Sequence, residues 1–194
     1  MLVSGAMTSD PVTVPPDHPV KKTLTLLQRH GVTALPVVAD DGRLVGVVSE
    51  ADLIRDAVPH DPRARMLPAG PDQRPPQTVA EVLTPAPVTV RPHDDLATAV
   101  DRMGTHRVKS LPVVDEHGRV VGIIARSDVV RMLARPDGAI AAEIRETLRT
   151  AGYADWRVTV TDGVVEITGP EPAERSLAES VAHTVGGVVE VRIG

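Results

Sequence analysis

Apolar and polar positions along the chain follow an order that occurs twice before residue 136. Each copy opens with a short helical piece that ends at Thr8 or Thr84, followed by the extended stretch PVTV. An amphipathic helix comes next, because apolar side chains recur at i, i+4 and i+7. These are Val20, Leu24 and Leu27 in the first copy and Leu96, Val100 and Met103 in the second. Two apolar strands around a glycine turn and a closing helix complete the pattern, which predicts β-α-β-β-α.

The two copies also match residue by residue. The segment LPVVADDGRLVGVVSEADLIR at 35–55 returns as LPVVDEHGRVVGIIARSDVVR at 111–131, without a gap. An internal duplication is the simplest explanation. Because the strands are short and apolar on both faces, we expect the repeats 1–58 and 78–136 to pack on each other as a pseudo-two-fold pair. Residues 59–77 contain six prolines and almost no apolar periodicity, which predicts a linker.

The pattern changes after Pro136, where a third, small domain is expected over residues 137–194. Residues 138–151 place their apolar side chains on one helical face. The segment RVTVTDGVVEITG is typical of a β-hairpin, with two alternating strands around Asp162 and Gly163. A helix and a final strand, VVEVRI, follow, so the order is α-β-β-α-β. The fold class expected for the whole chain is therefore mixed, α/β (α+β).

Composition describes an ordinary globular protein, with 42% hydrophobic residues and a net charge of −5. No apolar run approaches the ~18 residues of a membrane span, and the first repeat leaves no room for a signal peptide, so a cytoplasmic protein is expected. The chain has no cysteine, and Tyr153 and Trp156 are its only aromatic residues, which argues against nucleic-acid binding. The whole net charge falls in residues 137–194, with 10 acidic and 5 basic side chains.

A polar pattern closes each repeat. Ser49 and Asp52 precede an apolar helix with the spacing of a capping box, in which a hydroxyl and a carboxylate bind free N–H groups at the helix start. The second copy keeps the acid, Asp128, but has Ala125 in place of the serine. No Ser/His/Asp arrangement, glycine-rich phosphate loop or histidine pair at metal-ligand spacing accompanies them. These residues indicate neither an enzyme nor a metal or cofactor site, and capping alone is one explanation of them.

Residues 46–52, GVVSEAD, resemble the signature of CBS domains, in which a glycine among apolar residues is followed by S/T-x-x-D. With the duplication, the chain resembles a CBS pair, a regulatory module that binds adenosine-containing ligands. The segments DGVVEITG and GGVVEV resemble a BON domain. The CBS resemblance implies that the aspartate accepts hydrogen bonds from ribose hydroxyls, while the serine and the helix start face phosphates. It also implies that each pocket joins the closing strand and helix of one copy to the opening strand of the other.

Two pockets follow from this resemblance. The first is lined by Ser49, Asp52, Thr84, Pro87, Val88, Val108, Lys109 and Ser110. The second is lined by Ser127, Asp128, Thr8, Pro11, Val12, Val32, Thr33 and Ala34. The first is better suited to a phosphate, because Lys109 has the uncharged Thr33 as its counterpart. An adenine ring is expected between aliphatic side chains such as Val88 and Val108, for which plain core packing is the alternative role.

The resulting expectation is a non-enzymatic sensor without a cofactor. It binds AMP, ADP, ATP or S-adenosylmethionine between the repeats and relays occupancy through the BON-like domain to an unknown protein partner. Two alternatives stay open: a structural or protein-interaction module with unoccupied pockets, and a membrane-surface adaptor, which the negative charge of the last domain disfavours. Apolar side chains on the closing helices, Leu53 and Ile54 or Val129 and Val130, predict a homodimer, as the family resemblance also implies.

Overall fold

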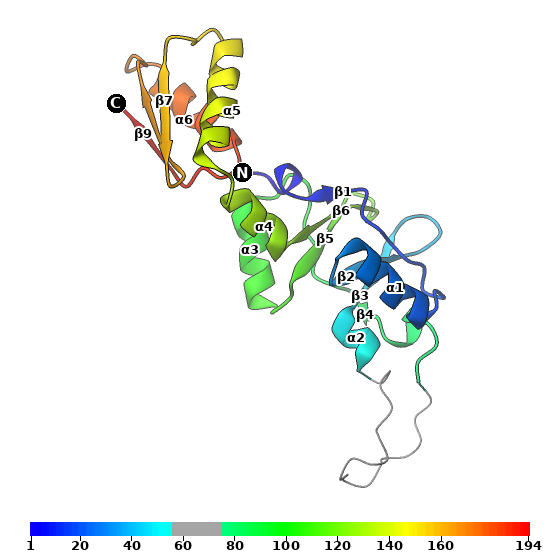
Figure 1. Cartoon of the computed structure of the whole chain (residues 1–194). Coiled ribbons are helices and arrows are strands. Elements are labelled where there is room, and N and C mark those ends of the chain that lie inside the picture. The colour runs from blue at the N-terminus through cyan, green and yellow to red at the C-terminus, as the bar shows by residue number, and fades with distance from the viewer. Residues whose placement is uncertain (56–74) are drawn as a thin grey trace, which may run out of the picture. The chain divides into compact units, whose positions relative to one another are not determined.

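Two compact units make up the part of the chain that the structure, a computed structural model, describes: residues 1–55 and 75–194. One unit contains Met1–Met7, His93–Asp101 and Ile124–Gly194, and the other contains the described residues of Thr8–Pro92 together with Arg102–Ile123. Figure 1 labels their elements in chain order. The predicted linker lies outside the described residues except for positions 75–77, and so does the end of the first predicted repeat, residues 56–58.

Each repeat has the predicted order of a strand, a helix, two strands and a helix, with a short 3-10 helix in front. The first copy contains η1 (Val3–Gly5), β1 (Thr8–Ser9), α1 (Val20–His30), β2 (Ala34–Val38), β3 (Leu44–Ser49) and α2 (Glu50–Ile54). The second contains η2 (Val79–Glu81), β4 (Thr84–Pro85), α3 (Leu96–Thr105), β5 (Ser110–Val114), β6 (Val120–Ala125) and α4 (Arg126–Leu133). The predicted mixed fold class is confirmed.

The two copies exchange their first strands. β4 of the second copy pairs antiparallel with β3 of the first, with Thr84 opposite Val47. β1 of the first copy pairs antiparallel with β6 of the second, with Thr8 opposite Ile123. The sheets therefore have the orders β2-β3-β4 and β1-β6-β5, and the two hairpin turns meet through backbone hydrogen bonds of 3.0 and 3.1 Å. Each copy completes the sheet of the other.

The stretch PVTV does not form the opening strand that the sequence predicted. Strands β1 and β4 lie earlier, and Thr8 and Thr84 belong to them rather than to a helical piece. The reason is a turn in each copy, where Asp10 and Ala86 adopt left-handed backbone conformations with φ of 48° and 47°. The chain leaves the sheet at this turn, and PVTV afterwards makes only isolated bridges with the second strand of its own copy.

The buried faces of α1 and α3 depart alike from the predicted spacing, because each buries position i+3, Thr23 or Ala99, more completely than the predicted i+4. Val20 and Leu27 are buried, and Leu24 packs against the same cluster. In α3, Ala99 is buried whereas Val100 is 42% exposed, so the buried face is rotated from the predicted one. Alanine is small and weakly apolar, and a search for large apolar side chains passes over it.

The closing helix of the first copy buries one side chain that was expected on a dimer face. Leu53 is 0% exposed and packs in the core of its repeat, so this part of the expectation is wrong. Ile54, its neighbour, is 52% exposed. Adjacent residues of a helix point about 100° apart, and only one of the two can face the core. In α4 the same contrast holds in weaker form, because Val129 is half-buried and Val130 is exposed.

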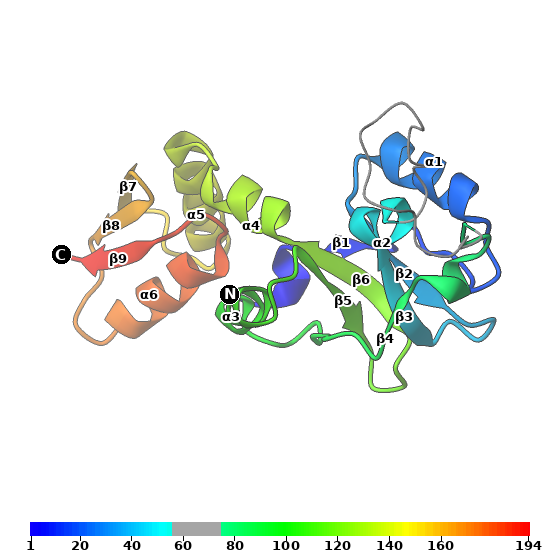
Figure 2. The same ribbon diagram turned by 90° about the horizontal axis from the view of Figure 1, so that it is seen from below.

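The C-terminal domain has the predicted order α-β-β-α-β. It consists of α5 (Asp137–Thr150), β7 (Arg157–Thr161), β8 (Val164–Thr168), α6 (Arg175–Thr184) and β9 (Glu190–Ile193). β7 and β8 form the expected hairpin, and Asp162 and Gly163 in its turn have φ of 50° and 76°, as a type I′ turn requires. β9 joins β8 in parallel. Helices α5 and α6 cover one face of this sheet (Figure 2), where Ile144 and Ile167 are buried.

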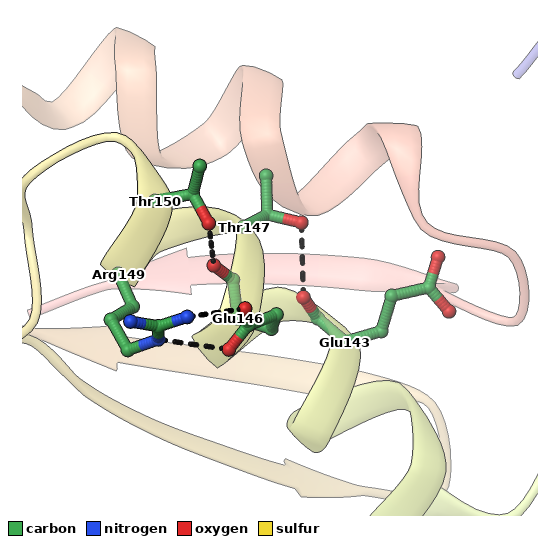
Figure 3. A network of polar contacts seen from close by, with 5 residues as sticks. All are labelled: Glu143, Glu146, Thr147, Arg149 and Thr150. Carbon is green, nitrogen blue, oxygen red and sulfur yellow. Dashed lines mark hydrogen bonds and ion pairs between the residues drawn. The ribbon is translucent and has the colours of Figure 1, made fainter.

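The outer face of α5 is polar and bonded within the helix (Figure 3). The Glu146 carboxylate accepts two hydrogen bonds from the Arg149 guanidinium, at 2.6 and 2.9 Å, and these bonds lower the pKa of Glu146. The Thr150 hydroxyl donates to the Glu146 carbonyl at 2.9 Å. Such a face is typical of a helix that borders water. Among the residues that the structure describes, no helix is both long enough and apolar enough to cross a bilayer.

Candidate ligand-binding site

A cavity of about 600 Å³ lies within one compact unit, the one that contains Thr8–Pro92 and Arg102–Ile123. The first copy contributes the start of β2, the end of β3 and α2. The second copy contributes β4 with the loop that follows it, and the segment between α3 and β5. The volume falls within the range of roughly 300–1,000 Å³ that is usual for small-molecule sites.

All eight residues that the resemblance placed in the first pocket line this cavity. They are Ser49, Asp52, Thr84, Pro87, Val88, Val108, Lys109 and Ser110. Strand exchange brings them together, because the pairing of β4 with β3 puts Thr84 opposite Val47, near the end of β3. α2 begins directly after β3, so Ser49 and Asp52 lie at the same end of the strand. The geometry thus unites these residues, while their role in binding a ligand stays a proposal.

Ser49 and Asp52 form the capping box that their spacing predicted. Oδ2 of Asp52 accepts a hydrogen bond from the Ser49 N–H at 2.9 Å and another from the Ser49 hydroxyl at 2.6 Å. The Asp52 N–H donates to the same hydroxyl at 3.3 Å. Oδ1 lies 3.6 Å from the guanidinium of Arg55, beyond normal hydrogen-bond length. Because the side chain is 15% exposed, capping leaves Oδ1 able to accept a hydrogen bond from a ligand.

Asp128, at the same position of the second copy, is held more completely by its own helix. Its Oδ2 accepts the Ala125 N–H at 2.8 Å, and its Oδ1 accepts a hydrogen bond from Arg131 at 2.6 Å. Ala125 supplies no side-chain cap. Asp128 is only 7% exposed. Both carboxylate oxygens therefore already have a donor, and little of the side chain is exposed to a ligand.

Two residues that the sequence assigned to the second pocket also line the first cavity. Ala34 lies opposite Ser49 in the pairing of β2 with β3, and the Glu50 N–H donates to the Thr33 carbonyl at 3.0 Å. An antiparallel hairpin joins the beginning of its first strand to the end of its second. Thr33 and Ala34 are therefore neighbours of the capping box of their own copy, while their predicted role in the second pocket stays a prediction.

The other members of the second set belong to different compact units. Thr8 is exposed in β1, Pro11 and Val12 are half-buried in the loop that follows, and Val32 packs against the core of the first copy. Ser127 is exposed and Asp128 is buried on α4, in the other compact unit. For these six residues a role in ligand binding stays a prediction.

Arg107 and His106 also line the cavity, and the sequence did not single them out for it. Arg107 follows α3 with φ of 54°, a left-handed conformation, and the matching residue of the first copy is Gly31, with φ of 63°. A residue with a side chain is less stable there than glycine by about 1–2 kcal/mol. The sequence does contain a signal for Arg107: the first copy has a glycine, Gly31, at the end of the matching helix, and the second copy has an arginine there.

The lining combines apolar walls with groups that bind sugars and anions. Aliphatic side chains come from Val47, Val88 and Val108, hydroxyls from Ser49, Thr84 and Ser110, and charges from Glu50, Asp52, Arg107 and Lys109. Aliphatic groups can enclose a heterocyclic ring, a carboxylate can accept hydrogen bonds from a ribose, and cations attract phosphate. Within residues 1–55 and 75–194, no group of three or more His, Cys, Asp or Glu side chains is placed to hold a metal ion.

Comparisons with known proteins match both parts of the chain. The model of the CBS domain matches residues 3–58 and 79–135, and the model of the BON domain matches residues 136–193. Inosine-5'-monophosphate dehydrogenase of Mycobacterium tuberculosis is 33% identical over 133 residues, which are 68% of this chain and 22% of that protein. The chain therefore spans about a fifth of the length of this relative.

Two solved structures with bound nucleotides are similar over the repeats. CBSX2 of Arabidopsis thaliana in complex with AMP is 31% identical with a TM-score of 0.54, covering 67% of this chain and 93% of that one. The cytosolic domain of the Mg2+ channel MgtE in complex with ATP is 32% identical with a TM-score of 0.52, covering 67% and 48%. The chain belongs to the CBS-domain family, as a tandem CBS pair followed by a C-terminal BON domain.

Proposed function

We propose that this protein is a non-enzymatic regulatory sensor that binds an adenosine-containing ligand in the cavity between its CBS repeats. One observation carries the proposal: Ser49 and Asp52 of the first copy meet Thr84, Lys109 and Ser110 of the second around a single cavity of about 600 Å³. A ligand that contacts both copies favours the arrangement in which they are closed around it. A bound ligand therefore stabilises the association of the two repeats with each other.

Each group in the cavity has a defined role in this proposal. Oδ1 of Asp52 accepts hydrogen bonds from the ribose hydroxyls, because Oδ2 is already bonded to Ser49. Val88 and Val108 enclose the adenine ring, and Lys109 attracts a phosphate. The two nucleotide-bound relatives support this class of ligand, since both are more than 30% identical to the chain and contain AMP or ATP.

Thermal unfolding in the presence of AMP, ATP or S-adenosylmethionine, each added separately, tests the proposal. A ligand at about 100 times its dissociation constant stabilises the folded state by about 2.7 kcal/mol if it binds only that state. We expect a higher melting temperature with at least one of the three. No shift with any of them at millimolar concentration contradicts the proposal and favours the structural or protein-interaction module.

We further propose that occupancy is relayed to the BON domain through the joint between α4 and α5. Arg135, between the two helices, donates to the Gly186 carbonyl at 2.9 Å and forms an ion pair with Glu143. Gly186 approaches α4 so closely that a Cβ on it would lie 3.0 Å from Cγ of Met132. The BON domain is thus packed against the last helix of the CBS pair rather than joined to it by a free tether. A movement of α4 must then also displace Gly186 and α5.

Hydrogen exchange of the full chain, with and without AMP, tests the relay. We expect AMP to change the protection of amides in α5 and α6 of the wild type. The variant Arg135→Ala should lose this response and keep its affinity for AMP. Arg149→Ala, on the outer face of α5, is the matched control and should respond like the wild type. Unchanged exchange in the wild-type BON domain would contradict the relay and leave ligand binding intact.

A homodimer is also part of the proposal. Val130 and Leu133, one turn apart on α4, are 63% and 53% exposed, and Ile54, at the repeat position of Val130, is 52% exposed. A second copy related by a two-fold axis covers such apolar side chains on both chains at once. Light scattering that gives a monomer of 20.6 kDa over a wide concentration range would contradict the dimer.

We propose the cytoplasm as the location, which the similarity to the cytosolic domain of MgtE supports. The membrane-surface alternative is disfavoured by the charge of residues 137–194, which carry 10 acidic and 5 basic side chains and would be repelled by an anionic bilayer. Co-sedimentation with anionic vesicles tests that alternative. Binding that requires the vesicles to be anionic would favour the membrane-surface adaptor and contradict its rejection.

A further inference from the structure

Two cations on one short segment distinguish the second copy from the first. Arg107 and Lys109 lie between α3 and β5, and both line the cavity. At the matching positions the first copy has Gly31 and Thr33, which carry no charge. Both cationic side chains are exposed, and within the described parts of the chain neither forms an ion pair or a side-chain hydrogen bond. The segment therefore presents two positive charges to the cavity that no carboxylate of the described chain neutralises by direct contact.

The backbone at Arg107 is a second, independent observation. Both copies make the same left-handed turn after their helix, with φ of 54° at Arg107 and 63° at Gly31. The turn is closed alike, because the N–H of Arg107 donates to the Gly104 carbonyl at 3.2 Å and that of Gly31 to the Gln28 carbonyl at 3.3 Å. Glycine adopts this conformation freely, whereas an arginine in it is strained. Strained residues are frequent at ligand sites. A role in binding therefore explains an arginine at this position better than a role in folding does.

Adenosine ligands differ mainly at the 5′ end of the ribose. AMP and ATP carry anionic phosphate there, S-adenosylmethionine carries a sulfonium cation, and adenosine carries an uncharged hydroxyl. A guanidinium binds phosphate oxygens through two parallel hydrogen bonds and repels a cation. The acids of the cavity do not remove this preference, because Asp52 is bonded to Ser49, and Glu50 is exposed and forms no ion pair with Arg107 or Lys109 in the described chain.

We propose that Arg107, assisted by Lys109, is the specificity-determining residue of the cavity and selects adenosine ligands that carry phosphate. The selection acts against adenosine itself and against S-adenosylmethionine. This inference rests on the proposed function and deepens it by naming the class of ligand. AMP should bind at least about tenfold more tightly than adenosine, since the phosphate adds charged hydrogen bonds that adenosine lacks.

Calorimetric titration of the full chain with adenosine, AMP and S-adenosylmethionine tests the proposal. In Arg107→Gly, which copies the first repeat, the affinity for AMP should fall at least about fivefold, while that for adenosine changes less than about twofold. The melting temperature of the unliganded variant should not fall, because glycine relieves the left-handed strain. Arg107→Asn, which tolerates the same backbone and has no charge, should show the same loss and serves if the glycine variant does not fold.

The matched control is Arg29→Ala, because Arg29 is an exposed arginine of α1 that is not part of the cavity lining. It should leave all three affinities unchanged. Equal affinity of the wild type for adenosine and AMP overturns the inference, and so does unchanged AMP affinity in both Arg107 variants. Either result leaves nucleoside binding intact. Failure of all three ligands to bind contradicts the proposed function itself.

Discussion

The closing helices of the two repeats begin with the same extended backbone at the N-cap and have different side-chain contacts there. In the first copy, one carboxylate oxygen of Asp52 accepts a hydrogen bond from the Ser49 N–H. The other oxygen lies 3.6 Å from the guanidinium of Arg55. In the second copy, Asp128 is bonded to Arg131 at 2.6 Å and is almost fully buried. The same acid in the same place of a duplicated unit is thus available for a ligand in one copy and satisfied by its own helix in the other.

In the segments that precede the second strand of each copy, it is the second copy that has the charged groups. The second copy has Arg107 and Lys109 where the first has Gly31 and Thr33. One cavity receives the available acid from the first copy and the cations from the second. The duplicated fold thus fixes where the cavity lies, whereas a few unmatched side chains set its charge and its hydrogen-bonding groups.

Exchange of each aspartate for asparagine should give the largest difference between the copies. Asp52→Asn should weaken AMP binding by at least about tenfold, because a charged acceptor for the ribose is lost. Asp128→Asn should change the affinity less than about twofold. The melting temperature of unliganded Asp52→Asn should barely move, since asparagine is also a good residue at a helix start. Equal losses, or a larger loss at Asp128, would assign the dominant site to the other copy.

Substitutions at the two N-cap positions, Ser49 and Ala125, should change the free energy of unfolding in opposite directions. Ser49→Ala removes the hydroxyl that accepts the Asp52 N–H and should lower the free energy of unfolding by about 0.5–2 kcal/mol. The reverse change, Ala125→Ser, should raise it by up to about 1 kcal/mol, because α4 gains a cap that it lacks. Urea denaturation measures both. If Ala125→Ser does not stabilise the protein, the two helix starts differ in more than the missing hydroxyl.

The arginines one turn after the acids should show a smaller difference. Arg131→Ala breaks a direct hydrogen bond to Asp128 and should lower the free energy of unfolding by about 0.2–1 kcal/mol, a modest amount because the arginine is largely exposed. Arg55→Ala should have almost no effect, because its guanidinium is 3.6 Å from Asp52. Denaturation curves of the two variants, measured side by side, test this difference. Equal effects would contradict a stronger contact of Arg131 with Asp128 than of Arg55 with Asp52.

The smallest expected effect concerns the hairpin turns, where the second copy has Asp115 and the first has Ala39. The Arg119 N–H, with that of His117, donates to the Asp115 carboxylate and lowers its pKa below the usual 3.8. A carboxyl with a lowered pKa stabilises the folded state above its ordinary pKa, and this contribution disappears as the pH falls through the lowered value. Asp115→Ala should therefore lower the melting temperature slightly at neutral pH and not in strong acid. The exposed neighbour Glu116→Ala is the control, and a difference that persists in strong acid would contradict this origin.

The sequence predicted the elements well, because the duplication repeats their pattern and a hairpin signal such as Asp162-Gly163 is local. It predicted the capping box for the same reason. The facing directions were harder: Leu53 is buried and Ile54 exposed, yet both are apolar neighbours on one helix. Arg107 was missed because its position depends on a left-handed turn that the sequence shows only through the glycine of the other copy.

The sequence also did not place Thr33 and Ala34 at the first cavity, which they line, for a different reason. Their neighbourhood depends on the register between β2 and β3, which sets Ala34 opposite Ser49. A side-chain pattern shows which face of a strand is buried, but the ends that meet across a hairpin follow from the pairing itself. Residues that strand pairing brings together are thus the part of a site that a single sequence leaves undetermined.

The exchange of first strands also determines the order in which a newly made chain can fold. β3 leaves the ribosome before β4 exists, so its pairing edge stays open until the second repeat begins, and β1 must wait for β6 near the end of that repeat. Pairings between residues so distant in sequence form slowly. An open strand edge can meanwhile accept a strand from a neighbouring nascent chain. Synthesis that stops after the first repeat should consequently yield an aggregation-prone fragment rather than a folded half of the CBS pair.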